Sequence, residues 1–184
     1  MSRSRMFASL SAAALVASGV AFAPPASAGD EPPTITKERT GANPIVAGSS
    51  SGTQFTITVT NNYVQPYSFG VSDIAPPGMI LTGATSSTWT NCSVETYGIS
   101  CSPAELAPGV PATLVVTAVA AAWVRPSTLI NCAFIGQAYT APEVARAVTP
   151  SVPQGCAIRA PEVTPSNGFY GYAEASVDVI NDAD

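Results

Sequence analysis

The eight residues TQFTITVT, which run from Thr53 to Thr60, form the most regular stretch of the sequence. In an extended chain, Phe55, Ile57 and Val59 lie on one face and the intervening threonines lie on the other. This strict alternation predicts a β-strand with one buried and one solvated face. The fold is therefore expected to be built on half-buried strands.

Short extended segments separated by turn residues continue on either side of this strand. Residues 67–72 alternate in the same way, whereas the stretch from Asp73 to Gly78 contains two prolines that lack the N–H of a central ladder, and it predicts a turn. Further strands are expected at residues 79–82, 84–91, 112–120, 131–140 and 169–180. In the segment 131–140, the inward face is either Cys132, Phe134 and Gly136 or Ala133, Ile135 and Gln137. This pattern predicts an all-β fold, an Ig-like antiparallel two-sheet β-sandwich of seven or eight short strands with no helix of consequence.

Residues 1–28 have the order of a cleavable export signal. Arg3 and Arg5 precede an uncharged apolar stretch, and the triplet Ala26-Ser27-Ala28 ends it. An uncleaved membrane anchor is the alternative, but the many small residues and two prolines disfavour it. We expect cleavage after Ala28, a secreted or extracellular location, no membrane span after cleavage, and a single domain over residues 29–184.

The mature segment is acidic. Both basic residues of the leader leave with it, so 5 of the 7 Lys and Arg residues remain against 12 Asp and Glu. A surface of this charge disfavours nucleic acid and anionic membranes, because both require basic patches.

Four cysteines lie in the exported part, at Cys92, Cys101, Cys132 and Cys156. An even number in an oxidising compartment predicts two disulfides, and three connectivities are open. We favour the local pairs Cys92–Cys101 and Cys132–Cys156, each of which would tie down a turn-rich connection. Zinc or redox chemistry is the alternative, but the chain has no His and no close C-x2-C pair.

An ordered series of short motifs spans residues 34–138. It resembles the bacterial cell-surface repeat domain labelled DUF11, and the matching residues are Lys37, Phe55 to Asn61, Val71, Asp73, Pro77, Gly78, Trp89, Cys92, Cys101, Leu106, Pro108, Gly109, Asn131 and Ala133. The resemblance implies an Ig-like sandwich used for surface display, spacing or adhesion, and no chemistry. The chain departs from the family by a long insertion at about residues 140–168, where a protein-specific recognition function would lie.

No catalytic constellation emerges from the residue types. A hydrolytic triad lacks its base because the chain has no His, and a cysteine nucleophile would be oxidised. The carboxylates that a glycosidase would need are interpreted as solvated or turn residues, and Asp73 as a cap of its turn. A calcium site at the terminal Asp178, Asn181, Asp182 and Asp184 is disfavoured by their spacing, so we expect no metal and no cofactor.

The predicted function is that of a secreted or cell-surface, non-catalytic structural or adhesive interaction module. Its partner would be an unknown protein or cell-envelope component, and the oligomeric state is left open, with a monomer as one option. The alternative is an extracellular carbohydrate or small-ligand binder. Its candidate contact residues are the aromatic side chains Trp89, Trp123, Phe169, Tyr170 and Tyr172.

Overall fold

The computed structural model describes residues 31–136 and 169–181. The predicted signal and its cleavage site, the insertion at about residues 140–168 and the last three residues lie outside the described residues, so the predictions about them remain predictions. Within the described ranges the chain forms strands, turns and loops and no helix. The all-β prediction is confirmed.

Ten strands are present rather than seven or eight. They are β1 (Thr34–Arg39), β2 (Ile45–Val46), β3 (Thr53–Thr60), β4 (Tyr67–Ile74), β5 (Met79–Thr85), β6 (Cys92–Glu95), β7 (Gly98–Leu106), β8 (Pro111–Ala120), β9 (Ser127–Gly136) and β10 (Phe169–Ile180).

Four of the ten strands, β1, β2, β6 and β7, were not among the expected ones. Of these, β2 and β6 are too short to show a period of two along the sequence. The prediction of a separate strand at residues 84–91 was also wrong. β5 continues past Gly83, where its pairing with β8 changes register, and residues 86–91 are not a strand.

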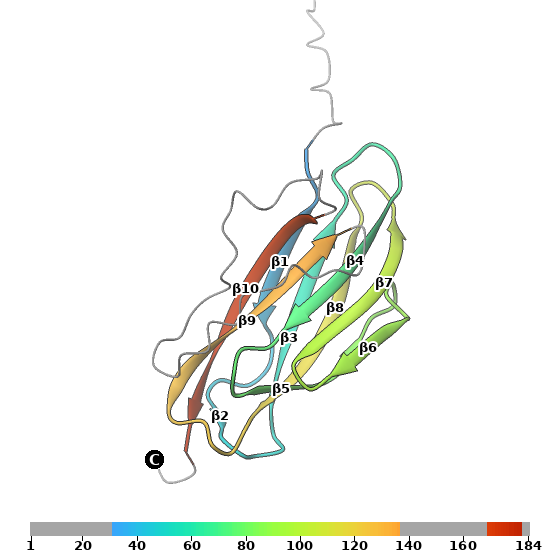
Figure 1. Cartoon of the computed structure of the whole chain (residues 1–184). Coiled ribbons are helices and arrows are strands. Elements are labelled where there is room, and N and C mark those ends of the chain that lie inside the picture. Colours follow the sequence, from blue (N-terminus) through green and yellow to red (C-terminus); the bar gives the residue numbers. More distant parts are fainter. Residues whose placement is uncertain (1–30, 137–168, 182–184) are drawn as a thin grey trace, which may run out of the picture.

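The strands form two sheets that pack face to face (Figure 1). The four-stranded sheet has the order β1-β3-β8-β5, and the six-stranded sheet has the order β2-β10-β9-β4-β7-β6. Neighbouring strands are antiparallel in every pair except β2 and β10, which are parallel. The predicted sandwich is therefore present, with one parallel pair at the edge of the larger sheet.

The core lies between the inward faces of the two sheets. Phe55, Ile57 and Val59 of β3 are fully buried, as their alternation predicts, and each of them removes apolar surface worth about 1.5–3 kcal/mol from water. β8 contributes Leu114 and Val116 from the next strand of the same sheet, where they are fully buried too. The inward side of the other sheet completes the core with Phe69, Val71, Ala133, Ile135, Val177 and Val179.

β9 is buried on both faces, which explains why its sequence did not reveal an inward side. Ala133 and Ile135 belong to the core between the sheets, so their face is the inward one. Cys132 and Phe134 lie on the other side of the strand and are nevertheless 7% and 2% exposed. A strand covered on both faces loses the polar-apolar alternation that identifies a half-buried one.

The turn after β4 begins at Ala75, two residues later than expected, because Asp73 and Ile74 belong to the strand. Gly78 closes the turn with a φ of +95°, a conformation that residues with a Cβ rarely adopt. A Cβ at this position would lie 2.5 Å from Cγ2 of Val124, so the neighbouring loop also requires glycine here.

One complete disulfide, Cys92–Cys101, lies within the described residues. It joins residues directly opposite each other in the β6–β7 hairpin. The disulfide therefore links two paired strands, whereas we expected it to tie down a turn-rich connection. Cys156 lies outside the described residues, so the predicted second disulfide, Cys132–Cys156, remains a prediction.

Replacing Ile57 by Ala is expected to lower the free energy of unfolding by about 2–5 kcal/mol, because a cavity would remain between the sheets. The matched control is Gln54→Ala, at an exposed position of the same strand, with an expected change within about 0.5 kcal/mol. Urea unfolding measures both. Equal effects of the two substitutions would contradict the assignment of the buried face.

Candidate functional site

The chain contains a single lysine, Lys37, and its side chain is fully buried between the sheets. It lies on β1, where Ile35 and Lys37 alternate with the exposed Thr34, Thr36 and Glu38. The side chain of Lys37 lies on the inward face of the sheet, with Nζ 5.1 Å from the ring centroid of Phe55. Lysine is almost never fully buried without a partner, so this position calls for one.

The partner is Asp73 of β4, in the opposite sheet. Its Oδ2 lies 2.5 Å from Nζ of Lys37, and its side chain is fully buried as well. The prediction that Asp73 is a solvated cap of a turn was therefore wrong. It was misled by the Pro-Pro-Gly that follows, because β4 extends to Ile74 and turns its carboxylate into the interior.

Asn131 of β9 completes the cluster. In the ladder between β4 and β9, Asp73 is opposite Ala133, so Asn131 is two residues away on the same inward face. Its side chain is fully buried, and neither its amide nitrogen nor its oxygen has a well-formed hydrogen bond. It is nevertheless close enough to Asp73 to lower the pKa of that carboxyl slightly.

Burial dominates the electrostatics of the cluster. Desolvation lowers the pKa of Lys37 below its ordinary value of 10.5, although the Asp73 charge and hydrogen bond oppose the shift. Desolvation likewise raises the pKa of Asp73 above 3.8, against the opposing effects of Lys37 and Asn131. Both shifts weaken the preference of each group for its charged form, while the contact between Lys37 and Asp73 opposes them. The interior thus holds an amine, a carboxyl group and a carboxamide, which we call the Lys37–Asp73–Asn131 cluster.

A second group of polar aromatics lies near one end of the sandwich. The hydroxyl groups of Tyr67 and Tyr170 are 2.8 Å apart, and both rings meet Phe69, with centroids 5.1 Å and 5.6 Å away. Burial and the Tyr67 hydroxyl raise the pKa of Tyr170. Tyr170, one of the candidate ligand contacts, is 8% exposed and packs in this cluster.

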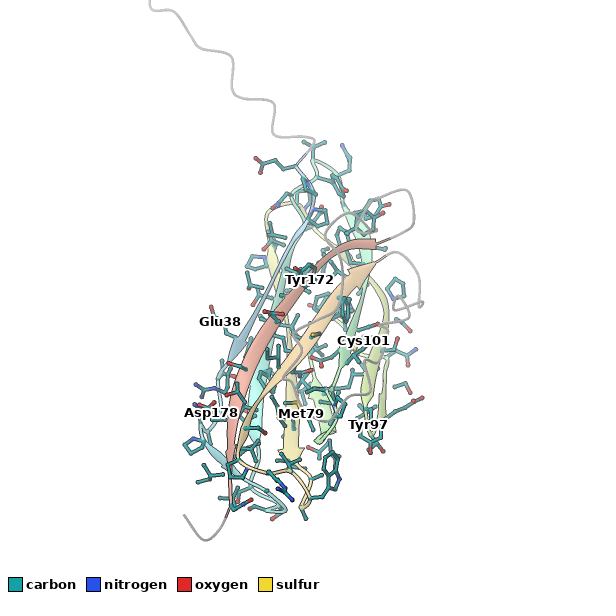
Figure 2. The ribbon with its side chains drawn as sticks, turned by 60° about the vertical axis from the view of Figure 1, so that its left-hand side comes forward. Glu38, Met79, Tyr97, Cys101, Tyr172 and Asp178 are labelled. Atoms are coloured by element: carbon teal, nitrogen blue, oxygen red, sulfur yellow. A yellow bond between two sulfur atoms is a disulfide. The ribbon has the colours of Figure 1, made fainter. Side chains whose placement is uncertain are left out.

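The other candidate contacts do not form a common surface. Trp89 is 2% exposed and donates its indole N–H to the carbonyl of Phe69 at 2.9 Å, so it packs in the core and offers no ring face to a ligand. Trp123, after β8, is 68% exposed. Tyr172 lies on β10 (Figure 2). It is 38% exposed, and the side chain of Phe169 lies outside the described residues.

The described residues do not form a cluster of side chains that would bind a metal ion. Asp178, at the far end of β10 from Tyr172 (Figure 2), accepts hydrogen bonds from Thr128 and Asn43, which lower its pKa. In residues 31–136 and 169–181, no three metal-ligating side chains come together. Over the same ranges, no helix has the length and apolar character needed to cross a membrane.

No protein-family model matches the sequence, and no curated protein is significantly similar to it. Among solved structures, the chain is similar to a variant of BcpA, the major pilin subunit of Bacillus cereus, with 15% identity and a TM-score of 0.52. The match covers 82% of this chain but 41% of that one, so the chain spans about two-fifths of the pilin.

Weaker matches are the collagen-binding subdomain of the Enterococcus faecalis surface protein ACE and AvmM, which catalyses macrocyclization in alchivemycin A biosynthesis. The ACE subdomain has 10% identity and a TM-score of 0.37, over 81% of this chain and 96% of that one. AvmM has 11% identity and a TM-score of 0.43, over 83% and 89% of the two chains. At these identities the pilin match shows the fold, a two-sheet Ig-like sandwich, which the prediction had named.

Sequence reasoning named all three residues of the cluster but did not bring them together. A signal was present, because Lys37 occupies an inward position in the alternation of β1 and is the sole lysine of the chain. A lone lysine on an apolar face indicates a buried partner of opposite charge.

Replacing Asp73 by Asn should make stability depend on pH through Lys37. The folded-state pKa of Lys37 is lowered, so between it and about 10.5 the unfolded chain binds one proton more than the folded chain. The free energy of unfolding of this variant should therefore rise with pH, by up to about 1.4 kcal/mol per pH unit.

The matched control for this series is the double variant Lys37→Met with Asp73→Asn, which has no titratable group at the site. Urea unfolding between pH 6 and pH 10 measures the difference between the two variants. Parallel pH curves would contradict a lowered pKa for the buried Lys37 amine.

Proposed function

We propose that this chain is an exported, non-catalytic structural or adhesive module that works at the cell surface or in the extracellular medium. The observation that supports it most is the two-sheet sandwich shared with the pilin subunit. The predicted export signal and the DUF11 resemblance favour the same role. BcpA is a major pilin subunit by description, and a corresponding structural role for this chain is our proposal.

The arrangement of side chains agrees with a structural role. The buried polar groups Lys37, Asp73 and Asn131 lie between the sheets, where a diffusible substrate has no direct access. A recognition surface would then be formed by loops and exposed strand faces, and the insertion at about residues 140–168 is our candidate for it.

Deleting the gene from the producing organism should reduce adhesion or surface assembly, and the full chain should restore it. The full chain should also be cleaved by protease added to intact cells. A chain lacking residues 1–28 is the matched control and should remain in the cytoplasm without restoring the phenotype. Restoration by the cytoplasmic form would contradict the proposal.

Carbohydrate binding is the second candidate, and the exposed indole of Trp123 favours it. Because Trp89 is buried, a ligand-induced change in tryptophan fluorescence would report on Trp123. The structural proposal predicts no response across a panel of glycans. A saturable response that disappears in Trp123→Phe would favour the binding module instead.

A further inference from the structure

We propose that one end of the sandwich is a membrane-contact surface, which rests on a neutral lipid bilayer. The surface consists of two loops, residues 61–66 between β3 and β4 and residues 107–110 between β7 and β8, which we call the apolar tip. Both loops lie at the same end of the sandwich (Figure 1). The proposal goes beyond the structural or adhesive role, because it names the chemistry that this end contacts.

The apolar tip exposes aliphatic side chains and carries no charge. Val64 is 54% exposed and Val110 is 57% exposed, and Pro66 and Pro108 beside them are exposed as well. None of the residues of the two loops is Asp, Glu, Lys or Arg. Apolar side chains gathered in this way are unfavourable in water, and transfer into a hydrocarbon environment would remove that cost.

A buried asparagine holds the two loops together. The side chain of Asn61 donates from Nδ2 to the carbonyls of Gln65 and Leu106, each at 2.9 Å, and Asn61 is fully buried. Its backbone carbonyl accepts the N–H of Gly109 of the other loop at 2.8 Å. Both loops are therefore held in one arrangement before any contact, so that binding through them costs little ordering entropy.

Tyrosines lie directly behind the apolar tip. Tyr63 belongs to the first loop, and its ring centroid is 5.3 Å from that of Tyr67, the first residue of β4. The hydroxyl of Tyr67 is in turn 2.8 Å from that of Tyr170. Tyrosine combines an apolar ring with a polar hydroxyl and is enriched where hydrocarbon meets water. Aliphatic side chains followed by tyrosines fit the order of a bilayer surface, from acyl chains to head groups.

The charges around the apolar tip favour one kind of bilayer. Glu105 comes directly before Leu106, and Glu31 precedes Pro32, whose carbonyl accepts a hydrogen bond from Nδ2 of Asn62 in the first loop. Both glutamates are exposed. Their carboxylates would be repelled by anionic head groups, whereas zwitterionic head groups have no net charge. A neutral bilayer is therefore the lipid surface that fits this end.

The path of the chain places the same end toward a membrane during export. Only two residues separate the predicted leader, residues 1–28, from Glu31. The leader would lie in the exporting membrane, so the end at which Pro32 meets the first loop would face that membrane. This orientation depends on the predicted leader, whereas the exposure of the two valines does not.

The test is flotation of the chain with protein-free phosphatidylcholine vesicles. The chain without residues 1–28 is used, because it keeps every residue of both sheets. We expect it to float with the vesicles. Val64→Asp and Val110→Asp should each weaken binding by at least about tenfold, because a carboxylate is costly to transfer into hydrocarbon. Val94→Asp, at a valine of β6 that is 42% exposed, is the matched control with the same change of charge and should bind normally. Cooperative urea unfolding shows that each variant is folded.

Vesicles with added phosphatidylglycerol separate apolar contact from charge attraction, and we expect them to bind the chain less well. Absence of binding to phosphatidylcholine, or binding that requires the anionic lipid and disappears in high salt, would overturn the proposal. An equal loss in Val94→Asp would overturn the assignment to the apolar tip. A concentration-dependent dimer that is lost in Val64→Asp would assign the tip to a second copy of the chain instead. None of these results would alter the adhesion phenotype of the gene deletion, so the two proposals fail separately.

Discussion

The burial of one lysine between two sheets is the constraint on which the rest of the structure depends. Lys37 comes from the four-stranded sheet, and Asp73 and Asn131 come from two adjacent strands of the six-stranded sheet. The pairing of β1 with β3 must place Lys37 inward, because a shift of one residue would expose it and bury Thr36 or Glu38 instead. The cluster therefore requires that both sheets have the correct register at once.

Much of the fold could be predicted from local pattern, because half-buried strands have a period of two. β3 is the best example, with Phe55, Ile57 and Val59 buried as expected. The pattern failed where a strand does not have one buried and one exposed face, or is too short to show the alternation. β9 is covered on both faces, β2 has two residues, and the Pro-Pro-Gly after β4 made Asp73 resemble a turn residue.

The candidate site was harder to predict because it is made by contacts between distant parts of the sequence. Asp73 is 36 residues from Lys37, and Asn131 belongs to a strand much further along the chain. Only the stacking of the two sheets brings them together. Trp89 shows a different error, since this aromatic residue was predicted as a possible ligand contact but is part of the core, where its indole N–H donates to the carbonyl of Phe69.

The most direct test of this account is a high-resolution crystal structure of the chain. We expect Nζ of Lys37 between the two sheets and within hydrogen-bond distance of the Asp73 carboxyl group. A Lys37 side chain that extends into solvent, with Nζ more than about 4 Å from the Asp73 carboxyl, would contradict it.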